Sequence, residues 1–252
     1  MDIKDFFNSF KNNNGNYNFS ISNNFNTNLP NISENIPDVY HNIADNLNYL
    51  KSKYNSLICD DIIIREFNLF VLNRTFKCFL IYIDGLVDSD SINNFILNPL
   101  MVKKHRYGNN YNNNLSDYVY NTLMPQNSIS TATSFSDVFS GINMGNCLVF
   151  IDTLNIAYDV DVKKYSTRSV SVPENESVIK GPQEAFTENF RTNTSLVRRI
   201  INNENLIIET ISVGKISKTK CGICYMGNIA NGDLVAEVKY RISNLDVDSV
   251  LS

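Results

Sequence analysis

Runs of apolar residues predict two pairs of β-strands that lie far apart in the chain. One pair is expected at 61–67 and 76–83, and the other at 206–211 and 220–226. β-Branched and aromatic residues are frequent in these runs and turn-forming residues separate them, which is typical of strands that pair with a chain neighbour. After each pair, a turn with a glycine leads into a helical spacing of apolar positions. Each pair therefore predicts a ββα unit.

The two predicted units are also similar to each other in sequence. Residues 58–92 align without gaps with residues 201–235, at a constant difference of 143 in residue number. Glu66 falls on Glu209 in this alignment, and the order of predicted elements is the same in both segments. Repetition of one supersecondary unit is the sequence signature of a duplicated architecture. The repeat therefore predicts a duplication.

The fold class expected from these patterns is α/β, with two related lobes and mixed sheets. The lobes are expected at 36–142 and 143–252. The remaining pattern adds a helix at 37–50, a strand at 128–133, a helix capped by Ser134 or Ser136, a hairpin at 147–151 and 156–160, and a helix from Pro182 to about Ile201. That last helix should bury an apolar face, made by Phe186, Phe190, Val197 and Ile201.

Composition changes this picture at the start of the chain. Asparagine is unusually frequent in the sequence and is densest before residue 30, where few aliphatic residues accompany it. Asparagine favours turns and caps over helix interiors, and a segment without apolar residues gains too little from burial to offset its ordering entropy. Residues 1–35 are therefore expected to be a flexible tail.

Charge and hydropathy limit the class of protein. The 252 residues carry a net charge of −4 and have a pI near 5.2, which argues against a nucleic-acid partner because such a partner requires a basic surface. No apolar run approaches the roughly 20 residues of a membrane-spanning helix, and no secretory signal precedes the first strand. The five cysteines are an odd number and are expected to be reduced thiols. These features predict a soluble intracellular domain.

The chemistry-bearing residues give little support for catalysis. Cys221 and Cys224 are spaced like a metal or redox pair, but both fall inside a predicted strand, where residues three apart face opposite sides. Buried small side chains are the expected role of these two cysteines. His41 and His105 have no nucleophile motif near them, and no phosphate-binding loop is present. We therefore expect no enzyme activity, no metal and no cofactor.

A cluster of charged and polar residues between 168 and 198 is the candidate functional site. Acidic side chains near the start of a helix and arginines near its end would stabilise the helix dipole and pair along one face, which is a purely structural interpretation. The alternative is that this face and the loop before it form a cleft wall or a partner surface. The candidate binding residues are Arg168, Glu176, Lys180, Glu184, Glu188, Arg191, Asn193 and Arg198.

Two segments of the chain resemble the A subunits of GerA-type spore germinant receptors. The first joins Asp61–Glu66 to Phe79–Val87 and Pro99-Leu100-Met101, and the second runs through 168–182 to 186–200. The resemblance covers about residues 36–252. The chain departs from the family pattern at Lys180, where an arginine is expected before Gly181-Pro182.

The resemblance implies a receptor domain without enzyme activity. Members of the family are proteins of the spore inner membrane, and their N-terminal domain faces the spore core, on the cytoplasmic side. The A subunit assembles with a transporter-like B subunit and a lipoprotein C subunit, self-associates, and triggers germination in response to nutrients. The family also implies a structure reminiscent of two-lobed solute-binding proteins. Two functions remain open: receptor assembly and signal transmission, or binding of a small-molecule nutrient in a cleft between the lobes.

Overall fold

The computed structural model describes residues 36–71, 74–101, 115–164 and 185–250. The expected tail at 1–35 lies outside these residues. Up to residue 164 the elements are α2 (Ile43–Lys53), β1 (Ile62–Val71), β2 (Arg74–Ile83), α3 (Ser89–Ile92), the π-helical turn η2 (Asn93–Leu97), α4 (Asn98–Met101), α5 (Leu115–Tyr118), the π-helical turn η3 (Val119–Leu123), β3 (Ile129–Ala132), α6 (Phe135–Asn143), β4 (Cys147–Ile151) and β5 (Ala157–Val160). They are followed by α7 (Phe190–Ile200), β6 (Leu206–Val213), β7 (Thr219–Met226) and α8 (Gly232–Ser243).

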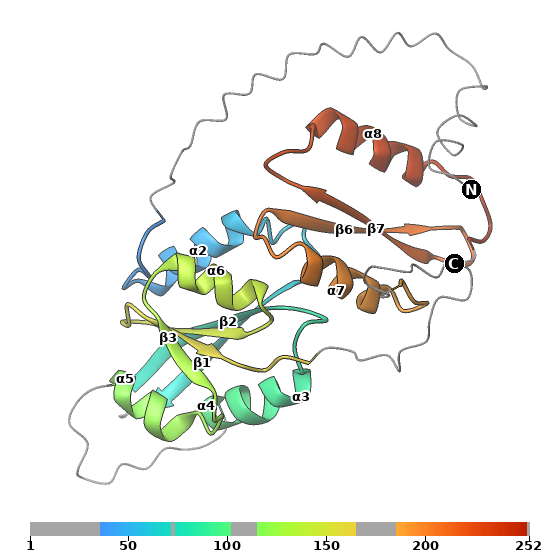
Figure 1. Ribbon diagram of the computed structural model, residues 1–252. Coiled ribbons are helices and arrows are strands. Elements are labelled where there is room, and N and C mark those ends of the chain that lie inside the picture. Colours follow the sequence, from blue (N-terminus) through green and yellow to red (C-terminus); the bar gives the residue numbers. More distant parts are fainter. Residues whose placement is uncertain (1–35, 72–73, 102–114, 165–184, 251–252) are drawn as a thin grey trace, which may run out of the picture. The chain divides into compact units, whose positions relative to one another are not determined.

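The central element is a five-stranded sheet with the order β1-β2-β4-β5-β3 (Figure 1). All of its strand pairs are antiparallel, so the expected mixture of parallel and antiparallel pairs is not found in it. The hairpins β1–β2 and β4–β5 confirm the sequence prediction at these positions. The β2–β4 pair, which joins them, connects residues that are about 70 positions apart and have no local signal in the sequence.

Helices cover both faces of this sheet and create two cores. Side chains of β2 alternate between them: Phe79 and Ile81 face α2 and α6, whereas Cys78 and Leu80 face η2, α4 and η3. This alternation follows from the pleat of a strand, in which successive side chains point to opposite faces. Because both faces are covered, β4 and the second half of β2 are apolar continuously rather than at every second position.

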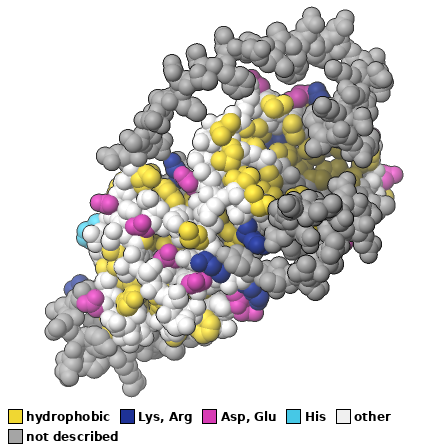
Figure 2. All heavy atoms as spheres, viewed as in Figure 1, with side chains coloured by type: hydrophobic (Ala, Val, Ile, Leu, Met, Phe, Trp, Pro, Cys, Tyr) yellow, Lys and Arg dark blue, Asp and Glu magenta, His cyan; other side chains and the backbone are white. Residues whose placement is uncertain are grey.

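The remaining elements form a separate two-stranded sheet with its own helices. β6 and β7 pair antiparallel, α8 packs on β6, and α7 contacts β7. Lys239 on α8 forms an ion pair of 2.5 Å with Glu209 on β6, and Glu209 also accepts a hydrogen bond from the Tyr225 hydroxyl. Leu234 on α8 is exposed, and in Figure 2 apolar side chains gather on the surface in the region of α8 and the two-stranded sheet.

The predicted repeat agrees with the order of elements but not with the full duplication. The β6–β7 hairpin and α8 lie where the alignment placed them. The strand register differs by one residue: Ile83 pairs with Ile62, whereas Met226 pairs with Leu206 rather than with Asn205, the equivalent of Ile62. A shift of one residue turns aligned side chains to opposite faces. Where two equivalent lobes were expected, the structure has a five-stranded sheet and a two-stranded sheet.

The expected division between residues 142 and 143 falls inside the five-stranded sheet. β4 and β5 follow this position in the chain, yet they pair with β2 and β3, which precede it. A cut there would break the backbone hydrogen bonds of two strand pairs, and residues 36–252 form one unit. The likeness to two-lobed solute-binding proteins stays a prediction.

Three details of the predicted elements need correction. The first helix begins at Ile43 rather than at 37, because the Asn42 side chain caps it by accepting a hydrogen bond from the backbone N–H of Ala44. Cys221 and Cys224 lie in β7 as predicted, but Cys221 is only partly buried and Cys224 is exposed, because β7 is a strand of the thin two-stranded sheet. The helix predicted from Pro182 begins at Phe190, within the described part of the chain.

Candidate functional site

Helix α7 buries a polar face. Asn189 caps its first turn by accepting a hydrogen bond from the backbone N–H of Thr192. Its buried residues are Thr194, Ser195 and Arg198, which lie on one side of the helix by their spacing. The sequence predicted an apolar inward face made by Phe186, Phe190, Val197 and Ile201, of which Phe190 and Val197 are half-buried. Phe186 is instead 68% exposed and precedes the helix, and Ile201 is 38% exposed.

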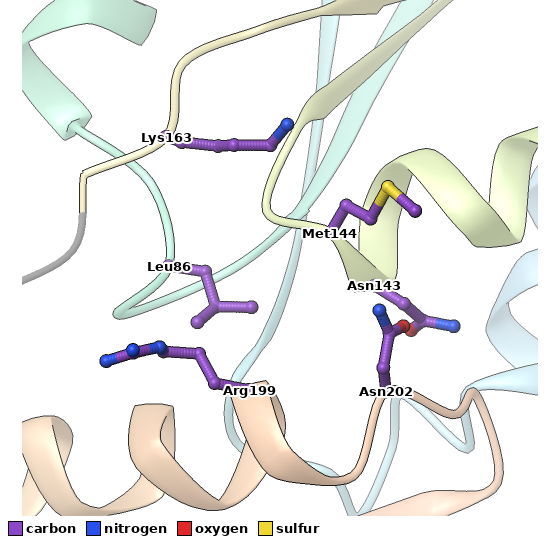
Figure 3. A pocket seen from close by; sticks show the side chains of 6 residues that line it. All are labelled: Leu86, Asn143, Met144, Lys163, Arg199 and Asn202. Carbon is purple, nitrogen blue, oxygen red and sulfur yellow. The ribbon is translucent and has the colours of Figure 1, made fainter. Parts of the chain in front are cut away.

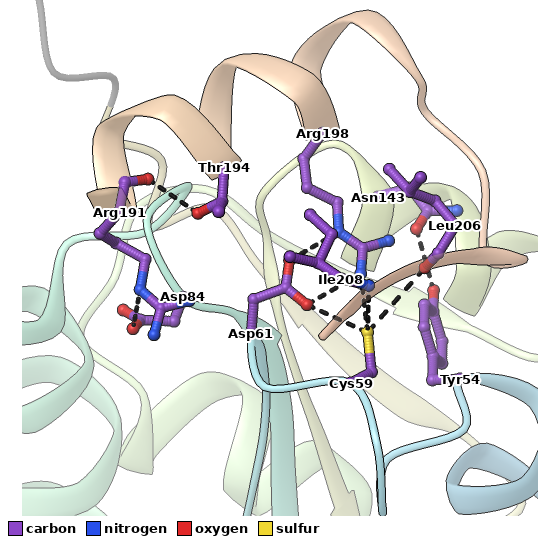
Figure 4. Close-up of polar contacts among 10 residues, drawn as sticks. All are labelled: Tyr54, Cys59, Asp61, Asp84, Asn143, Arg191, Thr194, Arg198, Leu206 and Ile208. Atoms are coloured by element: carbon purple, nitrogen blue, oxygen red, sulfur yellow. Dashed lines mark hydrogen bonds and ion pairs between the residues drawn. The ribbon is translucent and has the colours of Figure 1, made fainter. Parts of the chain in front are cut away.

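Arg198 and Asp61 form a buried ion pair with two hydrogen bonds (Figure 4). Arg198 Nε donates to Asp61 Oδ2 at 2.7 Å, and Arg198 Nη2 donates to Asp61 Oδ1 at 2.8 Å. Their side chains are 2% and 0% exposed. Burial alone would lower the pKa of the Arg198 guanidinium, but its hydrogen bonds and charge interaction with Asp61 outweigh burial and raise that pKa. The planar fork of an arginine matches a carboxylate in this geometry.

Cys59 completes this buried cluster, which we call the α7 joint. Arg198 Nη2 donates to Cys59 Sγ at 3.1 Å, and the backbone N–H of Ile208 in β6 donates to the same sulfur at 3.4 Å. The cluster thus links α7 and β6 to the segment just before β1. Burial, followed by the charge of Asp61, raises the pKa of the Cys59 thiol to about 12. Cys59 is therefore a neutral thiol that accepts hydrogen bonds within the joint, and it is not a nucleophile.

A second ion pair, which we include in the α7 joint, attaches the first turn of α7 to the end of β2. Arg191 Nε lies 2.9 Å from Asp84 Oδ2, and both side chains are about one-third exposed. Next to it, Gly85 has a φ of +93°, and an added Cβ there would lie 3.2 Å from Ser195 Cβ. Only glycine meets both requirements easily, the left-handed backbone and the close approach of α7.

The structure brings together two of the eight predicted site residues. Arg191 and Arg198 both contact the β1–β2 end of the sheet. Asn193 instead makes local hydrogen bonds, accepting from the backbone N–H of Thr187 at 2.7 Å and donating to its carbonyl at 2.7 Å, and Glu188 is exposed. The other four, Arg168, Glu176, Lys180 and Glu184, lie outside the described residues.

Sequence reasoning missed the partners of these arginines. Asp61 stands out only as an acidic residue at the start of a predicted strand, and it is 137 positions away from Arg198. No periodicity or spacing connects residues so far apart, so the pair follows from the tertiary packing of α7 on the sheet. The one local signal was the polar stripe itself, with Arg191, Ser195 and Arg198 at helical spacing.

A pocket of about 340 Å³ lies beside the last turn of α7 (Figure 3). Arg199 and Lys163 bring positive charge to it, and two asparagine amides add hydrogen-bonding groups. One of them, Asn143, is fixed because its Oδ1 accepts a hydrogen bond from the Tyr54 hydroxyl at 3.1 Å. The lining residues are Leu86, Asn143, Met144, Lys163, Arg199 and Asn202. This set of groups is suited to a small ligand that carries a carboxylate.

A metal-binding cluster is not found among the described residues. Within them, no three His, Cys, Asp or Glu side chains are grouped so that they could hold an ion. None of the described helices combines the length and the apolar character needed to span a bilayer.

Comparison with known proteins decides the family. The model of the family described as Bacillus/Clostridium GerA spore germination protein matches residues 48–252. The chain belongs to this family.

Among curated relatives of Bacillus subtilis (strain 168), Spore germination protein KA is 29% identical over 191 residues, which is 76% of this chain and 34% of that protein. The uncharacterized membrane protein YfkQ is 30% identical over 193 residues, 77% of this chain and 36% of that protein. The chain thus spans about a third of the length of these relatives.

A solved structure of the GerA family supports the same assignment. It is the crystal structure of the N-terminal domain of the A subunit of the Bacillus megaterium spore germinant receptor GerK3. The match has a TM-score of 0.59 and 27% sequence identity, and it covers 84% of this chain and 74% of that chain. The resemblance seen in the sequence is therefore confirmed at the level of family and domain.

Proposed function

We propose that this chain is the N-terminal domain of a germinant receptor A subunit, which acts without catalysis in receptor assembly and in transmission of the nutrient signal. In this proposal the full-length protein resides in the spore inner membrane, with this domain on the core side. Its partners are a transporter-like B subunit, a lipoprotein C subunit and further A subunits. Support comes from the family, and from the A-subunit domain of GerK3, to which the chain is similar.

The α7 joint is the observation that carries the proposed transmission role. Helix α7 is held to the β1–β2 end by Arg198–Asp61 and Arg191–Asp84, and its buried face is polar rather than apolar. Directional ion pairs define one arrangement of packed elements and are lost together when that arrangement changes. A ligand or partner that binds one arrangement better than another shifts the balance between them. The joint is thus suited to convert binding into a change of geometry.

Exposed apolar side chains on α8 and just after it support a role in assembly. Leu234 and Val238 on α8 and Leu245 after its end are 59%, 36% and 52% exposed, and α8 has no buried residue. Apolar side chains grouped on one surface of a protein often mark a contact with another protein.

Substitution of Arg191 in the full-length receptor tests the transmission role. Arg191→Ala removes a half-exposed ion pair and so leaves the fold intact, but it loosens the joint. We expect germination to slow by about tenfold, within the usual range of coupling energies between sites, while the receptor stays in the membrane at its normal level. The measurement is the germination rate of spores, with receptor quantified by immunoblot.

Lys51→Ala is the matched control for this experiment. Lys51 on α2 forms an exposed ion pair with Glu66 on β1, outside both α7 and α8, and its loss should not change germination. Arg198→Lys tests the buried pair directly, because it keeps the charge but loses the two-bond fork. Normal germination and normal receptor assembly in both Arg191→Ala and Arg198→Lys would exclude the joint from signalling.

The second candidate function is binding of a small-molecule nutrient. The pocket next to α7 favours it, because cationic and amide groups from α6, α7 and the end of β5 converge there. In this alternative the nutrient binds in this pocket and α7 senses its occupancy.

Thermal unfolding of the chain against a panel of amino acids, sugars and nucleosides tests this alternative. A ligand at 100 times its dissociation constant should add about 2.7 kcal/mol, which raises the melting temperature by roughly 5–10 °C. Asn202→Asp places a carboxylate in the pocket in a side chain of the same size, so it should abolish the melting-temperature shift caused by a carboxylate ligand. Asn94→Asp makes the same substitution on the exposed side of η2 and should leave that shift unchanged. A panel without any shift would rule out nutrient binding by this domain and leave assembly and transmission as its role.

A further inference from the structure

The carboxyl of Asp159 lies in the sheet without the partners that an ionised carboxylate needs. Asp159 is on β5, between Leu148 of β4 and Ser130 of β3. Its Oδ1 atom is buried and accepts no hydrogen bond from any described residue, and the same is true of Oδ1 of Asn146. Asn146 lies in the turn between α6 and β4, and its amide donates a hydrogen bond to the Asp159 carboxyl. Two adjacent side chains thus each leave one buried acceptor without a donor.

Helix α6 approaches the carboxyl closely at Gly141. A Cβ added to Gly141 would lie 2.6 Å from Asp159 Oδ2, so the glycine is what lets the helix approach the carboxyl. Lys163 is the described cation near Asp159, but its ammonium is paired with Asp161 at 3.6 Å. The other titratable neighbours are Asp161 itself and the Cys147 thiol of β4. A buried acceptor without a donor costs about 1–3 kcal/mol, so a missing hydrogen is expected here.

We propose that Asp159 holds a proton that its Oδ1 donates to Asn146 Oδ1, and that this acid–amide pair is a pH-sensitive lock between β5 and the α6–β4 turn. In the closed form the Asn146 amide donates to one oxygen of the acid and the acid donates to the Asn146 carbonyl. A single proton then satisfies both buried acceptors. When Asp159 ionises, that proton leaves, and two electron-rich oxygens face each other without a donor.

Electrostatics and position support the lock. Burial raises the pKa of Asp159, and the hydrogen bond from Asn146 and the charge of Lys163 counteract it only in part. Asp159 also lines a polar pocket of about 400 Å³, which gives the carboxyl a route for proton exchange. The turn that Asn146 fixes follows Asn143 and Met144, which line the pocket beside α7. Opening of the lock would therefore loosen one wall of that pocket.

The lock has a defined effect on stability as the pH changes. A carboxyl whose folded-state pKa is raised stabilises the fold fully below its unfolded-state pKa, about 3.9, and this stabilisation is lost as the pH rises through the folded-state pKa. Asp159→Asn makes the contact independent of pH, because an amide at this position donates a hydrogen bond to Asn146 at every pH. We expect the folding equilibrium constant of the wild type, relative to Asp159→Asn, to fall by about tenfold per pH unit within that window.

The experiment measures urea unfolding of the wild type and of Asp159→Asn between pH 4 and pH 8, with Asp90→Asn as the control for an exposed carboxyl. In the wild type, NMR of ¹³C-labelled aspartate, assigned through the backbone, follows the Asp159 carboxyl and the amide signals of Gly145 and Asn146. Titration of all three with one midpoint, well above the value of an exposed aspartate, is the expected result. The lock would be overturned if the Asp159 carboxyl titrated at about 3.9, or if the folding equilibrium constant of the wild type relative to Asp159→Asn did not change with pH.

Discussion

Asp61→Ala should destabilise the protein by about 3–5 kcal/mol, because it leaves the charge of Arg198 buried and unpaired. Arg198 is 2% exposed and makes both its short hydrogen bonds with this carboxylate. The remaining hydrogen-bond partner of Arg198, Cys59, is a neutral thiol and cannot compensate the charge of the guanidinium. Urea unfolding of the 252-residue chain at pH 7 measures the loss.

Two further variants separate the cost of an unpaired charge from the value of the pair. Asp61→Ala combined with Arg198→Met should recover most of the loss, because an apolar side chain of similar length then fills the site. Glu237→Ala breaks the exposed pair with Arg241 and should change stability by less than about 1 kcal/mol. A loss below about 1 kcal/mol for Asp61→Ala would show that Arg198 reaches solvent, contrary to the buried joint described above.

Phe150→Ala should cost about 3–5 kcal/mol through loss of apolar contacts and creation of a cavity. Phe150 is 1% exposed on β4, and its ring stacks on Phe79 of β2 with centroids 4.6 Å apart and an interplanar angle of 10°. This pair lies where the two sequence-local hairpins meet in one sheet, so its loss weakens the contact that joins them. The measurement is again urea unfolding.

Phe186→Ala is the control that distinguishes the structure from the sequence prediction. The helical pattern placed Phe186 on an inward face, whereas the structure leaves it 68% exposed. We expect Phe186→Ala to change the free energy of unfolding by less than about 0.5 kcal/mol. Equal losses for Phe150→Ala and Phe186→Ala would contradict the described burial of both residues.

These stability predictions also bear on the proposed function. The α7 joint has a buried pair that the fold depends on, Arg198–Asp61, and a half-exposed pair, Arg191–Asp84, that can change without unfolding. A signalling role therefore has to be tested at Arg191 first, because defects at Arg198 or Asp61 can arise from loss of folded protein. The same reasoning applies to the Asp159 lock, for which the isosteric asparagine keeps the packing unchanged.

The sequence by itself determined the local elements. The β1–β2, β4–β5 and β6–β7 hairpins, the capping of α6 by Ser134 and the position of α8 after the β6–β7 hairpin all follow from patterns within about 30 residues. The family was also recognisable from the sequence, because ordered matches along the chain do not depend on the tertiary structure.

Only the tertiary structure decided how these elements combine. The β2–β4 pair joins two hairpins into one sheet, and it gave no local sign because any apolar strand edge can pair with another. Helix α7 shows the same limit: its apolar residues predicted one buried face, but Asp61 and Asp84 are positioned to receive the arginines, so the polar face is buried instead. A buried charge requires a specific partner, and that partner is 137 residues away. Local patterns record which side chains avoid water, whereas the partner of a buried polar side chain is set by which distant elements meet.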